Sequence, residues 1–225
     1  MDMIYENNYT RLCGTLAGAP AYSHTGRGQV FYSFPLEVRR LSGNTDTVNI
    51  VVSRERLEQT ELCEAEHIAV TGQLRTFNNR RGEGAKLVIT VLAKEIELCD
   101  EPDENTVRLT GALCKEPNLR ITPMGRDICD LMLAVNRRYG RSDYLPCICW
   151  GLKAREAATW MVGTQVNLEG RIQSRRYIKM TEDGPVERTA FEVSVIQAEA
   201  VTAALKTEAL QRSALLLSKP LTGTK

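Results

Sequence analysis

The chain has 225 residues, of which 43% are apolar, 25% charged and 6% aromatic. This length suits one medium domain or two small ones, and the composition is that of a soluble globular protein rather than a disordered or collagen-like chain. No stretch approaches the ~18–20 consecutive apolar residues of a membrane span, and residues 1–10 do not resemble a secretory signal, so we expect a cytoplasmic protein with no membrane partner.

The net charge of +1 hides an asymmetry between the two halves of the chain. Residues 1–104 carry 11 Lys and Arg against 16 Asp and Glu, a net of −5, whereas residues 105–225 carry 18 against 12, a net of +6. A polyanionic partner would therefore prefer the second half. Chance drift between two domains explains the same asymmetry, so charge alone does not decide.

The chain has seven cysteines, an odd number, and its sequence contains no Cys-x-x-Cys motif. The two histidines, His24 and His67, do not lie near a pair of cysteines in the sequence. We therefore predict no metal site and no cofactor. Most of the cysteines lie in apolar, strand-like runs, which is typical of small buried side chains in a reducing cytoplasm.

An internal repeat organises the chain. Leu12–Leu16 (LCGTL) recurs as Leu109–Leu113 (LTGAL), Val70–Leu74 recurs as Leu168–Ile172, and the offset stays at 97 to 98 residues. A steady offset predicts two copies of one domain. We place them at residues 1–100 and 105–200, with an acidic linker at 100–104 and a tail at 201–225 that begins inside a helix expected over 198–217.

Each copy is expected to be mostly strand. In chain order we predict a helix at Arg54–Cys63 of the first copy and, in the second copy, strands at Val107–Leu113, Cys129–Arg138 and Tyr144–Trp150, a helix at Lys153–Val162, and strands at Gln165–Tyr177 and Thr189–Gln197. Three strands, a short helix and two strands predict an all-β fold of two tandem five-stranded OB-fold barrels. Gly14, Gly72, Gly111 and Gly170 fall within strands, as barrel corners and bulges require.

Basic and aromatic residues interleave on the strands and loops of the second copy. Aromatic faces stack on unpaired bases and arginines hold phosphates, so this pattern predicts binding of single strands. Two alternatives stay open: Trp150 belongs to the core, and the arginine pairs form a solvated rim. Trp160 is assigned to the core. The candidate residues are Arg120, Arg137, Arg138, Tyr139, Arg141, Tyr144, Trp150, Lys153, Arg171, Arg175, Arg176, Tyr177 and Lys179.

The second copy resembles the bacterial single-stranded-DNA-binding protein family. The resemblance rests on Asn105–Gly111, Lys115–Arg120, Leu133–Arg138, Gly163–Gly170 and Gln173–Tyr177. It implies an OB-fold barrel that binds single strands without sequence preference. It also implies that Tyr139, Tyr144, Trp150 and Tyr177 occupy the family's stacking positions.

The first copy resembles the same family more faintly. Its residues at the stacking positions are Leu41, Thr47, Ser53 and Asn79, none of them aromatic, and Phe77 shares a strand face with the last of these. We expect weaker phosphate contacts and a mainly architectural role for this copy, with its other aromatics in the core or an interface. The candidate contacts are Arg39, Arg40, Arg75, Phe77, Arg80, Arg81 and Lys86; the aromatics expected in the core or an interface are Tyr9, Tyr22, Phe31, Tyr32 and Phe34.

The resemblance also implies partners. It predicts a homodimer that presents four barrels and acts on single-stranded DNA, at the nucleoid, in replication, recombination or repair; RNA is a further ligand that stacking accepts. Leu217–Lys225 holds no acidic residue, unlike the family's acidic tip that recruits other proteins. The alternative is a primosome or recombination accessory protein that acts through protein contacts. No catalytic motif is present, so we do not expect an enzyme.

Overall fold

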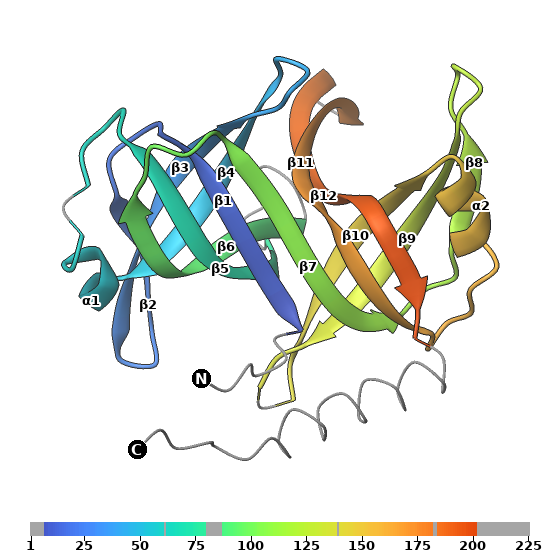
Figure 1. The fold of residues 1–225 in the computed structure, drawn as a ribbon, viewed down its shortest axis with the longest axis horizontal. Coiled ribbons are helices and arrows are strands. Elements are labelled where there is room, and N and C mark those ends of the chain that lie inside the picture. The colour runs from blue at the N-terminus through green and yellow to red at the C-terminus, as the bar shows by residue number, and fades with distance from the viewer. Residues whose placement is uncertain (1–6, 61, 80–86, 139, 182–183, 202–225) are drawn as a thin grey trace, which may run out of the picture.

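The computed structural model describes residues 7–60, 62–79, 87–138, 140–181 and 184–201. These residues form two barrels that lie side by side (Figure 1). The elements of the first barrel are β1 (Asn8–Leu16), β2 (Ala21–Gly26), β3 (Gln29–Arg39), β4 (Thr45–Ser53), α1 (Arg54–Leu57), β5 (His67–Asn78) and β6 (Leu87–Leu98). Those of the second are β7 (Glu104–Leu113), β8 (Asn118–Ile121), β9 (Asp127–Asn136), β10 (Ser142–Trp150), α2 (Leu152–Ala157), β11 (Gln165–Thr181) and β12 (Gly184–Ala200).

The two barrels repeat one topology. The strand order of the continuous sheet is β2-β3-β4-β6-β5-β1-β7-β11-β12-β10-β9-β8, and the additional pairings β1–β3 and β7–β9 close each barrel. In both halves the third and last long strands pair in parallel, as β4 with β6 and β10 with β12. Alternate residues of the long strands face a core of Leu, Val and Ile. The predicted all-β fold of two tandem OB-fold barrels is therefore confirmed.

Each half contains one short strand that the sequence analysis did not predict. β2 and β8 pair only with the strand that follows them, β3 and β9, and lie outside the five strands that enclose the core. They consist largely of exposed residues, so they lack the buried face that makes a strand visible in a sequence.

Three helix predictions need correction. Both barrel helices are shorter than expected. No helix formed by the described residues is long and apolar enough to cross a membrane. The helix expected from residue 198 is wrong at its start, because β12 continues to Ala200 and pairs Ala198 with Leu168 of β11. Residues 202–217 lie outside the described residues. Trp160, just beyond α2, packs against the core as predicted.

The barrels are joined through their first strands. β1 and β7 pair antiparallel from Asn8 opposite Leu109 to Cys13 opposite Glu104. Residues 99–103 connect the barrels at the predicted acidic linker. Arg11 of β1 holds this connection in place, because it donates to Glu101 within it (2.7 Å) and to Glu104 at the start of β7 (2.9 Å). The two barrels therefore share one sheet.

The glycines within strands mark close approaches between backbones. β11 bulges between Glu169 and Gly170, and β5 bulges between Thr71 and Gly72. A Cβ at Gly111 of β7 would lie 2.5 Å from the carbonyl oxygen of Ala134 in β9. Only glycine allows these strands to approach closely enough to close the barrel.

The substitution Gly111→Ala is expected to destabilise the protein by about 1–3 kcal/mol, because the added methyl group meets backbone rather than a movable side chain. Urea unfolding of the full chain measures the change. Gly26→Ala is the matched control, since its Cβ would meet only ordinary contacts of 3.7 Å or more. Equal stability of the two variants would contradict this account of barrel closure.

Candidate nucleic-acid interface

The outer face of β10 carries two exposed aromatic residues. Residues alternate along the strand, so Leu145 and Cys147 are buried in the second barrel whereas Tyr144 and Trp150 face outward. Tyr144 is 52% exposed and Trp150 is 40% exposed. This placement excludes the alternative that Trp150 is a core residue, and it leaves both ring systems accessible to a ligand.

β11 carries a third aromatic beside basic residues. The Arg175 guanidinium lies over the Tyr177 ring, 5.8 Å from its centroid, which is within the range of a cation–π contact. Tyr177 is half-buried, whereas Arg175 and Arg176 are exposed. β11 and β12 continue beyond the barrel as a long curled hairpin (Figure 1). Stacked arginine and aromatic groups of this kind can hold a phosphate and a base together.

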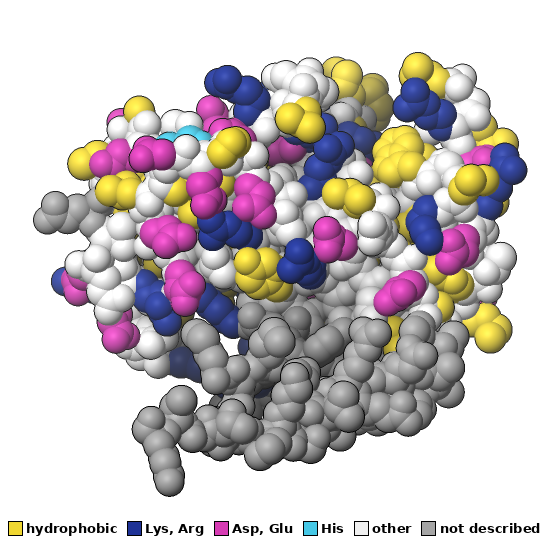
Figure 2. Space-filling view, viewed as in Figure 1, with side chains coloured by type: hydrophobic (Ala, Val, Ile, Leu, Met, Phe, Trp, Pro, Cys, Tyr) yellow, Lys and Arg dark blue, Asp and Glu magenta, His cyan; other side chains and the backbone are white. Residues whose placement is uncertain are grey.

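Exposed arginines lie near Tyr144 and Tyr177 in the sequence. Arg138 and Arg141 lie on either side of the turn between β9 and β10. Within the described part of the chain, Arg138, Arg141 and Arg175 form no ion pair, so their charges are available to an anionic ligand. Figure 2 shows basic and apolar side chains next to one another over the second barrel, and many acidic ones over the first.

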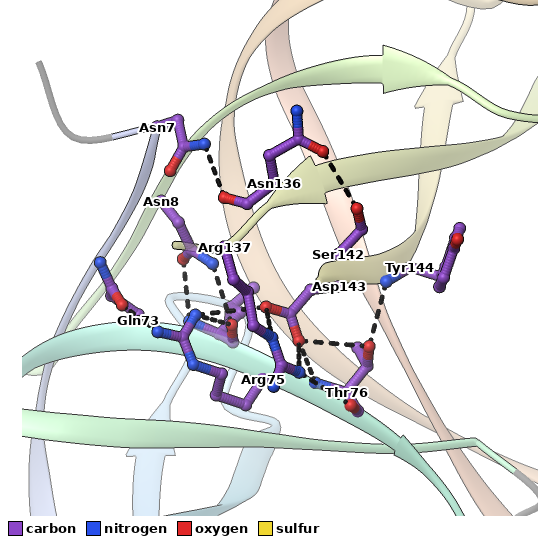
Figure 3. A network of polar contacts seen from close by, with 11 residues as sticks. Asn7, Asn8, Gln73, Arg75, Thr76, Asn136, Arg137, Ser142, Asp143 and Tyr144 are labelled. Atoms are coloured by element: carbon purple, nitrogen blue, oxygen red, sulfur yellow. Dashed lines mark hydrogen bonds and ion pairs between the residues drawn. The ribbon is translucent and has the colours of Figure 1, made fainter. Parts of the chain in front are cut away.

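Arg137 was predicted to contact DNA, but the structure places it between the barrels. Its Nε donates to Asp143 at 2.7 Å, and its Nη2 donates to the carbonyl oxygen of Thr76 in β5 at 3.0 Å (Figure 3). Arg75, also a predicted contact, reaches the same buried carboxylate at 3.2 Å. Asp143 in turn accepts from the Thr76 amide at 2.6 Å. This network joins the barrels and occupies both arginines.

The first barrel repeats the arrangement. Asp46 of β4 is fully buried, binds Arg40 in a bidentate pair and accepts from the Ser174 amide of β11 at 2.8 Å. In each barrel, one buried carboxylate thus accepts a hydrogen bond from a backbone amide of the other barrel. Arg40, a predicted DNA contact, is occupied here as Arg137 is in the second barrel. The signal for this role was present in the sequence, since Arg40 and Asp46 recur 97 residues later as Arg137 and Asp143.

Asp46 makes the folded protein sensitive to acid. Burial raises the pKa of its carboxyl, but the hydrogen bonds from Arg40 and Ser174 outweigh burial and leave the pKa below its ordinary value. A group whose pKa is depressed by folding stabilises the protein above its unfolded pKa, and this contribution is lost as the pH falls through the folded pKa. We expect the urea concentration at the unfolding midpoint to decrease as the pH is lowered below about 4. In Asp46→Asn the same decrease should be less steep. Identical pH profiles of the two proteins would contradict this expectation.

Other predicted basic contacts lie on the surface but have partners. Arg120 pairs with Asp130 at 2.5 Å and Lys153 with Glu156 at 2.6 Å, and both are exposed pairs that are weak in water. Arg171 is half-buried on the outer face of β11, and Arg39 is exposed at the end of β3. Tyr139, Arg80, Arg81, Lys86 and the side chain of Lys179 lie outside the described residues.

The first barrel lacks the aromatic surface. β4 and β10 are both nine residues long, and their third and ninth positions are Thr47 and Ser53 in β4 against Tyr144 and Trp150 in β10. Phe77 of β5 is 52% exposed and follows Thr76, whose hydroxyl accepts from the Tyr144 amide at 3.0 Å. Phe77 is therefore an exposed ring next in sequence to a residue that contacts the second barrel.

The remaining aromatics of the first barrel divide between core and surface. Phe34 is buried and Tyr32 packs against the core. Phe31 stacks on His24 with ring centroids 4.9 Å apart, and Tyr22 is 64% exposed on β2. Tyr9 lies beneath the Arg108 guanidinium at 5.9 Å. Of the two expected alternatives, the core is therefore confirmed for Phe34 and Tyr32 and excluded for Tyr22, for which an interface is the other expectation.

The structure also brings together thiols and a histidine that are far apart in the sequence. Cys13, His67 and Cys99 place their sulfur and nitrogen atoms within 4.8 Å of one another. The prediction of no metal site rested on spacing along the chain, which does not show contacts made by pairing of β1, β5 and β6. This cluster lies apart from the aromatic surface of the second barrel.

Comparison with known proteins identifies the second barrel. Residues 104–201 match the model of the single-strand binding protein family. The second barrel belongs to this family. Over 80 residues, the chain is 38% identical to single-stranded DNA-binding protein 2 of Listeria innocua (32% of this chain, 50% of the relative) and to the single-stranded DNA-binding protein of Clostridium tetani (32% and 55%).

The part that matches the family model accounts for less than half of the chain. The chain spans about half the length of the curated relatives it matches. A structural likeness extends over both barrels. The wild-type single-stranded DNA binding protein from Thermus aquaticus superimposes with a TM-score of 0.71, at 24% sequence identity, over 87% of this chain and 93% of the other. This likeness shows that the whole tandem arrangement is shared as a fold.

Proposed function

We propose that this chain binds single-stranded DNA without sequence preference and thereby protects exposed strands during replication, recombination or repair. The observation that carries the proposal is the outward-facing set Tyr144, Trp150 and Tyr177 beside exposed arginines, on a barrel of the single-strand binding family. Bases stack on the aromatic rings, and stacking tolerates any sequence because every base has a π-face. The role is one of binding, with no catalytic step.

The arginines that hold phosphates are exposed ones of the second barrel, near Tyr144 or Tyr177 in the sequence, that form no ion pair with another described residue. Arg176 joins them, because its pair with Glu187 spans 4.0 Å between exposed groups. We assign this role to Arg138, Arg141, Arg175 and Arg176. Arg40, Arg75 and Arg137 are excluded from it because their guanidinium groups already bind the buried carboxylates of Asp46 or Asp143 between the barrels. The first barrel contributes Phe77 at the junction and otherwise serves as a scaffold.

Fluorescence anisotropy with a labelled mixed-sequence oligonucleotide tests this function, using single strands and the matching duplex. Each phosphate contact on a single strand contributes a slope of about −0.7 to the dependence of log affinity on log salt concentration. Four arginine contacts therefore predict a loss of about 50-fold on going from 50 to 200 mM salt. Equal affinity for the duplex, or no binding to either, would favour an accessory protein that acts through protein contacts.

We also propose that the chain assembles as a homodimer that presents four barrels. The junction of β1 with β7 already joins two barrels within one chain, so a dimer is sufficient for four. Sedimentation equilibrium at micromolar concentration would give twice the mass of one chain. A monomer at all concentrations would contradict the assembly without affecting the assignment of the aromatic surface.

A further inference from the structure

Three neighbouring strands place a cluster of metal-binding groups on the outside of the first barrel. β1 pairs with β5 so that Cys13 lies opposite Ala69 and Thr15 opposite His67, which puts Cys13 and His67 on one face. Cys99 follows β6, and its amide donates to the carbonyl oxygen of His67 at 3.1 Å. The core lies on the other face, with Leu12 and Ile68.

The donor atoms of this cluster converge. Nδ1 of His67 lies 3.6 Å from Sγ of Cys13 and 3.5 Å from Sγ of Cys99, and the two sulfurs are 2.6 Å apart. Both thiols are free. Zn–S bonds of about 2.3 Å and a Zn–N bond of about 2.05 Å at tetrahedral angles require S–N separations of about 3.6 Å. The distances from Nδ1 of His67 to the two sulfur atoms therefore already match those around a shared zinc ion.

Asp103 orients the histidine toward the thiols. Its Oδ1 lies 3.0 Å from Nε2 of His67, so Nε2 carries the proton and the lone pair of Nδ1 faces the two sulfurs. A carboxylate behind a metal-binding histidine is the usual support for such a ligand. Asp103 also accepts from the Arg39 amide at 2.5 Å, which fixes the carboxylate itself.

We propose that Cys13, Cys99 and His67 bind one Zn²⁺ ion, with Asp103 as the positioning residue behind His67. Two thiolates and one imidazole are a donor set that zinc prefers over harder cations. Binding moves the sulfurs apart, from 2.6 Å to the ~3.8 Å that two Zn–S bonds require. The carbonyl oxygen of Glu101, 3.7 Å from Sγ of Cys13, or a water supplies the fourth ligand.

The site is structural in character. Its ligands come from β1, from the start of β5 and from the end of β6, and Cys99 and Asp103 bracket the connection between the barrels. A bound ion therefore clamps this connection onto the first barrel and fixes the point from which β7 departs. Because the unfolded chain does not assemble these ligands, binding of the ion stabilises the folded state.

Cobalt substitution of the full chain tests the proposal. The protein is fully reduced, freed of metal with a chelator and titrated with Co²⁺, whose thiolate charge-transfer and tetrahedral d–d absorption report the ligands. We expect one Co²⁺ per chain, displaced by Zn²⁺. Cys99→Ser removes one thiolate and weakens binding at least tenfold, and Asp103→Asn weakens it about 10- to 100-fold while the charge-transfer bands remain.

Cys63→Ser is the matched control, because Cys63 is exposed and outside the cluster, and it leaves the titration unchanged. His67→Gln is the second test of the ligand set, and circular dichroism verifies that each variant is folded. Two results would overturn the proposal: reduced wild-type protein that binds no Co²⁺ or Zn²⁺, or a Co²⁺ spectrum that is the same in Cys99→Ser. In the first case the paired thiols would be left as a candidate disulfide.

Discussion

Replacement of Trp150 by alanine is expected to weaken binding of single-stranded DNA by about 1–3 kcal/mol, or roughly 5- to 150-fold in Kd. The indole ring lies on the outer face of β10, and no residue in the equivalent position of β4 can replace it, because that residue is Ser53. Anisotropy titration at one fixed salt concentration measures the loss. Stability should change little, since the ring is partly exposed and lies outside the barrel core.

Two aromatic variants of the first barrel serve as controls for this experiment. Tyr22→Ala removes an exposed ring on β2, away from the proposed surface, and is expected to leave Kd unchanged. Phe77→Ala removes the ring at the junction and is expected to raise Kd for single-stranded DNA less than Trp150→Ala does. Equal losses from Phe77→Ala and Trp150→Ala would contradict the division of labour between the barrels.

The substitution Asp143→Ala is expected to cost about 3–5 kcal/mol of folding stability, because it leaves Arg137 and Arg75 partly buried without their carboxylate. It also removes the acceptor of the Thr76 amide, and with it a direct hydrogen bond between the barrels. Urea unfolding monitored by circular dichroism measures the change. A separation of one transition into two would show that the barrels had become independent.

Asp130→Ala is the matched control for the buried carboxylate. Asp130 also pairs with an arginine, Arg120, but both side chains are substantially exposed. Such a pair contributes about 0–1 kcal/mol. If the two substitutions destabilised the protein equally, the assignment of Asp143 as the link between barrels would be wrong, and Arg137 would again be a candidate for phosphate contact.

The fold was predictable because its signals are periodic and repeated. The alternation of Leu145 and Cys147 with outward residues shows a half-buried strand, and the 97-residue offset shows two copies. The short strands β2 and β8 were missed because they have no buried face. The extension of β12 to Ala200 was missed because alanine and glutamate favour helices locally, while pairing with β11 decides the outcome.

The candidate site was predictable in part. The aromatic positions follow from alternation along β10, so Tyr144 and Trp150 lie where the sequence predicted. Arginine is ambiguous, since the same residue type serves phosphates and buried carboxylates. Only the structure shows that Arg137 meets Asp143 and the backbone of the other barrel. The cluster of Cys13, His67 and Cys99 is invisible to spacing rules because three different strands bring it together.

Intrinsic tryptophan fluorescence tests the central claim most directly. The chain has two tryptophans, so the Trp160→Phe variant leaves Trp150 as the sole emitter. We predict strong quenching of that emission on titration with a mixed-sequence single strand, saturating with binding and reversed by added salt as the phosphate contacts weaken. Emission that stays unchanged while anisotropy still reports binding would contradict stacking on Trp150 and place the strand on another surface.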